Sequence, residues 1–237
     1  MPHELISFPT DAELAKASAA RWVTLLRERK TPDRPYNAAV SGGRIAKTFF
    51  SEIVRQAEGR AIFQNVNFFW ADERCVPPTD PESNYAIAHE LLFEPLKIPS
   101  AHIHRLRGEG PEPLALQEAV AAISKVAPVV KGQPVLDMIF LGMGEDGHVA
   151  SLFPGEPEAA INDPAVYRAV TAVKPPPRRI TLGYAAIAAA LDVWVVAAGT
   201  GKEAALKESL LPNGKTPLAR VLRLRAQTKI FTDIKTG

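Results

Sequence analysis

The chain has 237 residues, of which 46% are hydrophobic and 23% are charged, and these values exclude a disordered or fibrous protein because they are close to the averages for globular domains. The 28 Lys and Arg residues only just outnumber the 26 Asp and Glu residues, and they form no basic run, which excludes an extended nucleic-acid-binding surface. No segment reaches about 18 consecutive apolar residues, so the sequence predicts no membrane-spanning helix.

The N-terminal segment, the cysteine count and the length set further expectations. The N-terminal segment has no basic start followed by an apolar run, so it lacks the pattern of a secretory signal and we expect a cytoplasmic protein. Cys75 is the only cysteine, which excludes an internal disulfide, and we expect it to pack as a small hydrophobic side chain. The length favours one domain over residues 1–237, and we expect a monomer.

The first elements along the chain are a helix, a strand and a second helix. Thr10 and Glu13 match a capping box that opens a helix over residues 10–29. A short apolar run, "NAAV", then ends in two glycines and leads into a second helical pattern over residues 44–58. The predicted core-facing residues are Leu14, Ser18, Trp22, Leu25 and Leu26 in the first helix, and Ile45, Phe49, Ile53 and Val54 in the second.

The same order of strand and helix recurs three times. "VNFFWADER" ends in charges and leads through a Pro-rich loop to a helix over residues 84–93, "PVLDMIFLGMGEDGH" ends in glycines, and "DVWVVAAGTGKEAALKESLL" runs from a strand through glycines into a helix. This alternation predicts an α/β fold, a single domain with a mostly parallel, doubly wound (Rossmann-like) sheet and helices on both faces. Ligands of such sheets bind at the carboxyl ends of the strands.

Two of these strand ends are candidates for binding an anion. Gly42 and Gly43 stand at a predicted helix N-terminus, where backbone N–H groups favour a phosphate, although a tight turn without a ligand has the same pattern. Lys202 is predicted in the first turn of its helix, which disfavours a cation unless an anion is bound there. "GTGK" resembles part of a nucleotide-binding P-loop, but Val196 and Glu203 stand where that motif needs glycine and a hydroxyl. A small phosphate pocket and a solvated lysine both stay open.

The other two strand ends carry charged residues and a histidine. Asp72 and Arg74 directly follow an apolar strand, as either a solvated strand end or part of a site. His148 lies two residues after Asp146, and a carboxylate beside an imidazole is the usual pairing of a general base because the carboxylate fixes the tautomer. Arg178 and Arg179 are each able to complete a phosphate site with a bidentate fork.

Two further patterns are similar to those of cofactor sites. His102 and His104 are predicted on one face of a strand, but no third ligand has suitable spacing, so we expect no metal. Gly142, Gly144 and Gly147 have the G-x-G-x-x-G spacing of a dinucleotide loop. Prolines and charges follow the third glycine and supply no second strand, so we interpret the glycines as a sharp turn that presents a catalytic loop.

Six segments together resemble the 6-phosphogluconolactonase family: "SGG", "ADERCVPPTDPESNYAIAHELLF", "IHRLRGE", "LGMGEDGHVASLFPG", "RRITL" and "GTGKEAAL". That family is similar in fold to the glucosamine-6-phosphate deaminases. Deaminases carry a glutamate five residues after the histidine, where this chain has Phe153, and tend to have "DEY" where this chain has "DER". Many lactonases read "SGGSTP" where this chain reads "SGGRIA", so Arg44 replaces a hydroxyl residue.

The resemblance implies hydrolysis of 6-phospho-D-glucono-1,5-lactone, a phosphorylated sugar lactone, to 6-phosphogluconate in the oxidative pentose phosphate pathway. It implies that His148 is the general base, that Asp146 orients His148, that Arg74 stabilises the oxyanion and that Asp72 fixes sugar hydroxyls or Arg74. The implied phosphate-binding residues are Gly42, Gly43, Lys202 and Arg179, with Arg44 as a further candidate. No metal or organic cofactor is implied. A hexosamine-6-phosphate deaminase, a non-catalytic sugar-phosphate-binding protein and a nicotinamide-dependent dehydrogenase stay open as alternatives.

Overall fold

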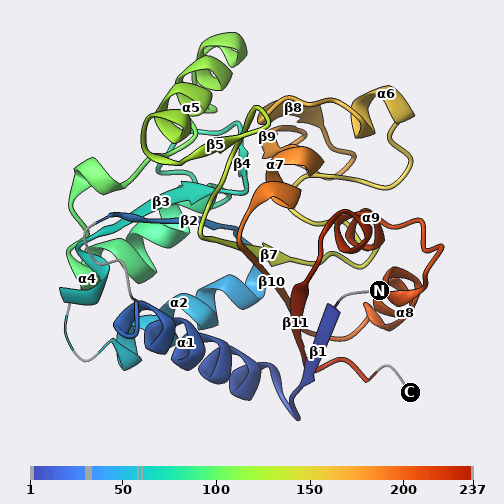
Figure 1. The fold of residues 1–237 in the computed structure, drawn as a ribbon, viewed down its shortest axis with the longest axis horizontal. Helices are drawn as coiled ribbons and strands as arrows, with labels where there is room; N and C mark the ends of the chain where they lie inside the picture. Colours follow the sequence, from blue (N-terminus) through green and yellow to red (C-terminus); the bar gives the residue numbers. More distant parts are fainter. Residues whose placement is uncertain (1–2, 30–33, 58, 60, 236–237) are drawn as a thin grey trace.

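Six parallel strands form the central sheet of the computed structural model, which describes residues 3–29, 34–57, 59 and 61–235. The sheet is flanked by helices on both sides, which confirms the predicted α/β fold (Figure 1). Across the sheet the strands follow the order β1 (His3–Ser7), β11 (Thr228–Thr232), β10 (Asp192–Ala197), β7 (Met138–Gly142), β2 (Tyr36–Val40) and β3 (Val66–Trp70).

The strand order reverses direction between β2 and β7. From β2 the chain continues outward to β3, whereas from β7 it continues to β10 and β11 on the other side. In open α/β sheets a crevice forms at such a reversal, outside the carboxyl ends of the two strands. The turns that follow β2 and β7 are "SGG" and "GMGEDGH", so the topology brings these two motifs together.

Helices cover the two faces of the sheet in separate layers. Figure 1 shows α1 and α2 below the sheet, and α7 and α9 above it. Their bounds, with those of the remaining helices, are α1 Asp11–Arg27, α2 Arg44–Gln56, α3 Asn84–Ala88, α4 Glu94–Leu96, α5 Glu112–Val126, α6 Glu158–Ile161, α7 Tyr184–Ala189, α8 Glu203–Leu210 and α9 Pro217–Leu224. One π-helical turn, His89–Phe93, joins α3 to α4. In the described part of the chain no helix has the length and apolar character needed to cross a membrane.

The first helix begins as predicted, but one of its five predicted core-facing residues is not in the core. The Thr10 hydroxyl accepts a hydrogen bond from the backbone N–H of Glu13 at 3.2 Å and caps α1. Leu14, Ser18, Trp22 and Leu26 are buried, whereas Leu25 is 37% exposed. Adjacent helical residues point about 100° apart, so Leu25 turns outward because Leu26 occupies the core position.

The second helix has its predicted inner residues in the core. Phe49 and Ile53 are buried, while Ile45 and Val54 are half-buried at the edges of the core-facing side of the helix.

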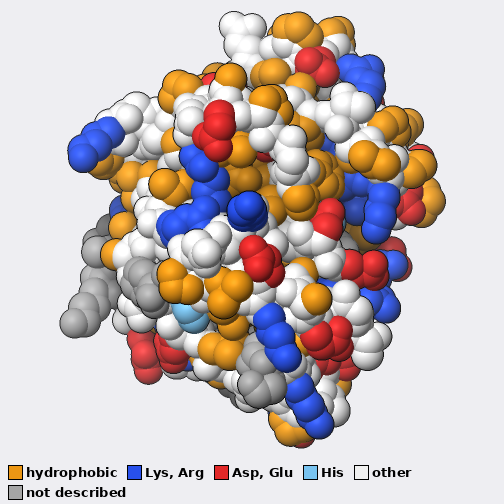
Figure 2. Space-filling view, turned by 90° about the vertical axis from the view of Figure 1, so that its right-hand side faces the viewer, with side chains coloured by type: hydrophobic (Ala, Val, Ile, Leu, Met, Phe, Trp, Pro, Cys, Tyr) orange, Lys and Arg blue, Asp and Glu red, His pale blue; other side chains and the backbone are white. Residues whose placement is uncertain are grey.

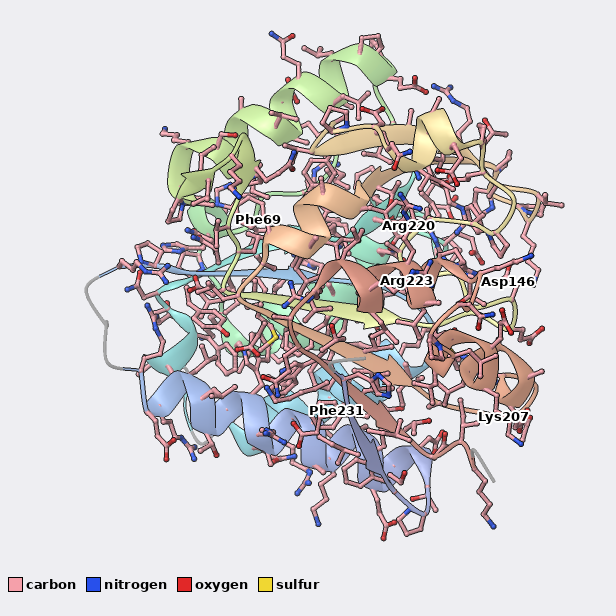
Figure 3. All side chains as sticks on the ribbon, turned by 45° about the vertical axis from the view of Figure 1, so that its right-hand side comes forward. Phe69, Asp146, Lys207, Arg220, Arg223 and Phe231 are labelled. Atoms are coloured by element: carbon pink, nitrogen blue, oxygen red, sulfur yellow. The ribbon has the colours of Figure 1, made fainter. Side chains whose placement is uncertain are left out.

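The strands also contribute aromatic residues to the core: Phe69 of β3 and Phe231 of β11 are buried (Figure 3). Asp146, by contrast, lies at the end of the molecule toward which the parallel strands point.

A second, smaller sheet was not predicted from the sequence. It is antiparallel and consists of β4 (Asp72–Arg74), β9 (Arg178–Leu182) and β8 (Tyr167–Thr171). The chain leaves the parallel sheet after β3, so "DER" forms a strand of its own rather than the end of a long one. The remaining two strands of the described residues, β5 (Val129–Val130) and β6 (Gln133–Pro134), have two residues each and form an antiparallel hairpin.

The predicted strand with two histidines on one face is wrong. Ser100–His102 form one turn of 3₁₀-helix, and Ile103 makes an isolated bridge to Phe68. The His104 ring instead stacks on Phe69, with ring centroids 4.6 Å apart. Within residues 3–29, 34–57, 59 and 61–235 the structure contains no cluster of three side chains that could hold a metal ion.

Candidate active site

A cavity of about 230 Å³ opens at the carboxyl ends of β2 and β7. Figure 2 views the molecule from the side toward which these strands point, and Lys and Arg side chains gather in groups on this face. Eight of the nine residues predicted for the site line the cavity: Gly42, Gly43, Arg44, Asp72, Arg74, His148, Arg179 and Lys202. The ninth, Asp146, contacts His148.

The turn before α2 exposes backbone N–H groups to the cavity. Gly43 is the N-cap of α2, with φ of +98°, and no side chain caps this end of the helix. The first N–H groups of a helix have no partner within it and favour an anion. Glycine is also required at position 42, because a Cβ there would lie 1.8 Å from Oδ1 of Asn84.

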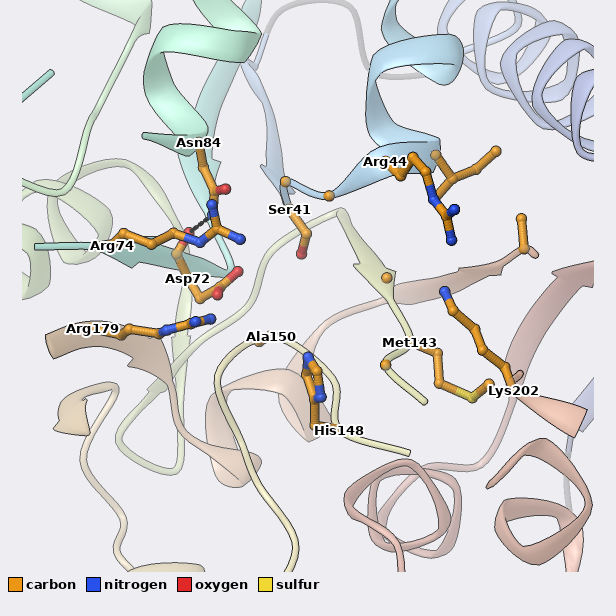
Figure 4. A pocket seen from close by; sticks show the side chains of 16 residues that line it. Ser41, Arg44, Asp72, Arg74, Asn84, Met143, His148, Ala150, Arg179 and Lys202 are labelled. Atoms are coloured by element: carbon orange, nitrogen blue, oxygen red, sulfur yellow. Dashed lines mark hydrogen bonds between the residues drawn. The ribbon is translucent and has the colours of Figure 1, made fainter. Parts of the chain in front are cut away.

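Arg44 and Lys202 point into the same end of the cavity, which we call the Lys202 end (Figure 4). Lys202 is the N-cap of α8 rather than a residue of its first turn, a shift of one position from the prediction. Burial and then the charge of Arg44 lower the pKa of Lys202. Neither cation forms an ion pair with a carboxylate of the described residues, so this end is suited to a bound phosphate.

His148 projects into the cavity between Lys202 on one side and Arg74 and Arg179 on the other, and we call the part from His148 to the two arginines the His148 end (Figure 4). Its Nδ1 lies 2.5 Å from Oδ1 of Asp146, and the same oxygen accepts the His148 backbone N–H at 3.1 Å. Although burial raises the pKa of Asp146, these bonds from His148 lower it below its ordinary value. Because Nδ1 faces the carboxylate, Nε2 is the atom left for proton transfer.

Gly144 makes room for the imidazole. A Cβ at this position would lie 2.1 Å from both Cε1 and Nδ1 of His148. The turn is not a dinucleotide loop, because the chain after Gly147 forms no helix until the short α6. Gly144 and Gly147 instead form a turn that presents His148 to the cavity.

Asp72 is held at the His148 end by two residues that the sequence analysis missed. The buried Ser151 hydroxyl donates to Oδ2 of Asp72 at 2.6 Å, and Nδ2 of Asn84 donates to the Asp72 main-chain oxygen at 2.8 Å. Asn84 also lines the cavity, as does Ser41. In the sequence, Ser41, Asn84 and Ser151 are marked only as polar residues within motifs already identified, "SGG", "SN" and "HVAS".

Glu73 supports the site from behind rather than lining it. Its carboxylate accepts backbone N–H groups from Arg74, Asn84 and Tyr85 at 2.7–2.8 Å, and the Ser83 hydroxyl at 3.1 Å. Burial raises the pKa of Glu73 to about 7, against the effect of these N–H donors. The middle residue of "DER" thus ties β4 to the start of α3, which positions Asn84.

Arg74 and Arg179 lie beside each other at the His148 end, because β4 and β9 place them directly opposite (Figure 4). Arg74 donates from Nη1 to the Glu82 main-chain oxygen at 2.6 Å. Arg178 is outside the cavity, where its largely exposed side chain lies 3.5 Å from Glu112. Of the two candidate arginines, Arg179 therefore faces the site, across the cavity from Lys202.

The cavity thus combines two chemistries. The Lys202 end offers backbone N–H groups and two cations, which suit a phosphate. The His148 end offers an oriented imidazole, a carboxylate and two guanidinium groups, which suit proton transfer and stabilisation of a developing negative charge.

Comparison with known proteins gives one family and a consistent set of relatives. The family model described as "Glucosamine-6-phosphate isomerases/6-phosphogluconolactonase" matches residues 9–231. A 6-phosphogluconolactonase of Haemophilus influenzae is 39% identical over 150 residues, covering 63% of this chain but only 61% of the relative. A 6-phosphogluconolactonase of Aggregatibacter actinomycetemcomitans is 32% identical over 234 residues, covering 96% of each chain.

Solved structures agree with the fold. The 6-phosphogluconolactonase from Trypanosoma cruzi has a TM-score of 0.82 at 26% identity, covering 98% of this chain and 94% of that one. A monomeric glucosamine-6-phosphate deaminase has a TM-score of 0.81 at 16% identity, covering 97% of this chain and 96% of that one. The second likeness shows that the two activities share one architecture.

Proposed function

Because the chain belongs to the glucosamine-6-phosphate isomerase/6-phosphogluconolactonase family, we propose that it hydrolyses 6-phospho-D-glucono-1,5-lactone to 6-phosphogluconate, a step of the oxidative pentose phosphate pathway. The observation that carries the proposal is the surroundings of His148. One carboxylate, Asp146, orients the imidazole, and the Phe153 ring packs against it with centroids 5.0 Å apart. Deaminases of the resembled type carry a second carboxylate at the position of Phe153, and lactone hydrolysis does not need one.

The substrate phosphate binds at the Lys202 end in this proposal. Backbone N–H groups at Gly42 and Gly43 and the cations Arg44 and Lys202 surround that end. Arg179, the remaining residue expected at the phosphate, approaches only from the opposite wall, beside Arg74. Phosphate binding therefore directs the lactone carbonyl toward the His148 end.

Hydrolysis then proceeds by general base catalysis. Nε2 of His148 takes a proton from water as the water oxygen attacks the lactone carbonyl carbon, and Arg74 stabilises the oxyanion that forms. Collapse of this intermediate breaks the bond between the carbonyl carbon and the ring oxygen, and His148 returns the proton to that oxygen. Asp72 accepts hydrogen bonds from sugar hydroxyls. The reaction needs no metal or organic cofactor, because an ester carbonyl is already electrophilic.

The test is a turnover assay on lactone generated immediately before use from glucose 6-phosphate. We expect acid release well above the spontaneous rate, and no ammonia from glucosamine 6-phosphate in a parallel assay. Ammonia release without lactone turnover would identify a deaminase instead. Binding of 6-phosphogluconate without turnover of either substrate would identify a sugar-phosphate-binding protein, and binding of NADP⁺ would reopen the dehydrogenase alternative.

A further inference from the structure

Positive charge lies at both ends of the cavity, whereas the proposed substrate is charged at one end only. The lactone carries its charge on the phosphate, and its reacting end is neutral. Hydrolysis converts that neutral end into a carboxylate. The cavity is therefore matched in charge to the open-chain product rather than to the lactone.

Arg179 is a buried cation that no carboxylate of the described residues pairs with. Its hydrogen bonds go to main-chain oxygens, with Nε donating to Pro176 at 3.1 Å and Nη2 to Lys174 at 3.3 Å, and its guanidinium lies over the Phe153 ring, 5.6 Å from the centroid. Burial and then the charge of Arg74 lower the pKa of Arg179. The charges of Asp72 and Glu82 raise this pKa, but neither carboxylate forms an ion pair with Arg179. A buried charge without a direct partner is costly, so this geometry favours an anionic ligand at Arg179.

The neighbouring Arg74 is also incompletely paired. Its ion pair with Glu82 is long, at 3.5 Å, and its Nε is buried without a hydrogen-bond partner. Asp72 is the acidic side chain among the residues that line the cavity, and the Ser151 hydroxyl donates to its Oδ2. Because directly opposite residues of antiparallel strands point to the same side, Arg74 and Arg179 present two guanidinium groups to one place.

We propose that Arg179, together with Arg74, forms a carboxylate-binding site. The cavity then binds phosphorylated sugar acids more tightly than sugar phosphates of the same length whose other end is uncharged. The proposal rests on the proposed function, because it takes the phosphate to lie at the Lys202 end. It assigns Arg179 to the carboxylate rather than the phosphate. Its consequence is regulatory: the enzyme retains its own product, and hydrolysis slows as the sugar acid accumulates.

The test compares two ligands by titration calorimetry at pH 7. The first is 6-phosphogluconate, and the second is D-glucitol 6-phosphate, which has the same carbon chain with a CH₂OH group in place of the carboxylate. Charge-assisted hydrogen bonds contribute enough to change affinity about 10- to 150-fold. We expect the wild type to prefer 6-phosphogluconate by a factor in this range.

Three variants locate the preference. Arg179→Met is expected to reduce the ratio of the two affinities about tenfold or more, whereas Arg178→Ala, its exposed neighbour, leaves the ratio unchanged. Lys202→Ala weakens both ligands by the same factor. If Arg179→Met does not fold, Arg179→Lys keeps the buried charge and removes the bidentate fork, and it is expected to reduce the ratio partially.

Equal wild-type affinities for the two ligands would overturn the proposal, and so would an Arg179→Met variant that weakens both ligands equally, since Arg179 would then act on the phosphate. Neither outcome bears on lactone turnover by the wild type, which tests the proposed function separately. Failure of both ligands to bind the wild type would overturn the proposed function together with the inference. If the wild type preferred 6-phosphogluconate but did not hydrolyse the lactone, the carboxylate site would stand and the proposed function would be overturned.

Discussion

The two ends of the cavity are built in different ways. The Lys202 end consists of a glycine turn, a helix N-terminus and two cations that follow strands of the parallel sheet. The His148 end draws Asp72, Arg74 and Arg179 from the small antiparallel sheet and fixes them by hydrogen bonds to side chains and main-chain oxygens, of which those of Asp72 are buried. This difference teaches that phosphate recognition here needs little more than backbone and charge, whereas the reacting end depends on side chains that other side chains orient.

Loss of the general base should have the largest effect. His148→Ala is expected to lower kcat about 10²- to 10⁴-fold with the fold intact, because Nε2 no longer accepts the proton of the attacking water. The lactone assay, corrected for spontaneous hydrolysis, measures this loss. The exposed His89 provides the matched variant, His89→Ala, which should retain full turnover. Near-normal turnover by His148→Ala would remove His148 from the mechanism.

Displacing the imidazole without removing it should have the next largest effect. A methyl group at Gly144 would lie 2.1 Å from the His148 ring, so Gly144→Ala forces the ring to move and is expected to lower kcat about 100-fold. Gly110→Ala is the control, because a Cβ there meets nothing closer than 3.6 Å. An unchanged kcat for Gly144→Ala would show that the ring position is not critical.

At the Lys202 end, substitution should act on substrate capture rather than on chemistry. Lys202→Ala is expected to lower kcat/KM about 10- to 150-fold, mainly through KM, because a charge-assisted contact to the phosphate is lost. Lys207→Ala, on the exposed side of the same helix, should have no effect (Figure 3). A fall in kcat at constant KM would contradict the division of the cavity into two ends.

The buried network at the His148 end should be visible in stability. Ser151→Ala removes the hydroxyl that donates to Oδ2 of Asp72, and it is expected to lower the free energy of unfolding by about 1–3 kcal/mol. Urea unfolding measures this change, with Ser51→Ala on the exposed face of α2 as the control. Equal stabilities of the two variants would show that Asp72 does not depend on Ser151.

The smallest predicted effect is a shift in pH dependence at the Lys202 end. Burial and the charge of Arg44 hold the pKa of Lys202 below 10.5. Lys202 is therefore fully protonated well below that lowered pKa, and the affinity for phosphate falls as the pH rises through it. Arg44→Gln removes the second cause, so the fall should move to higher pH. Binding titrations with 6-phosphogluconate between pH 7 and 10 give the pH at which affinity has fallen by half. The same midpoint in the wild type and in Arg44→Gln would show that Arg44 does not affect the protonation of Lys202.

The sequence by itself determined the fold class and most of the site. Strand and helix patterns predicted the parallel sheet, and because parallel strands end at one edge, residues after β2, β7 and β10 had to meet there. Gly42, Lys202 and His148 were therefore identifiable, since each follows a recognisable strand within a few residues.

Only the tertiary structure decided the details of the His148 end. Arg74 and Arg179 are far apart in the chain and become neighbours through the pairing of β4 with β9, which no local pattern specifies. The Ser151–Asp72 hydrogen bond and the packing of Asn84 against Gly42 are likewise contacts between distant segments. Local sequence encodes which residues stand at a strand end, but their partners depend on how strands outside the main sheet pair.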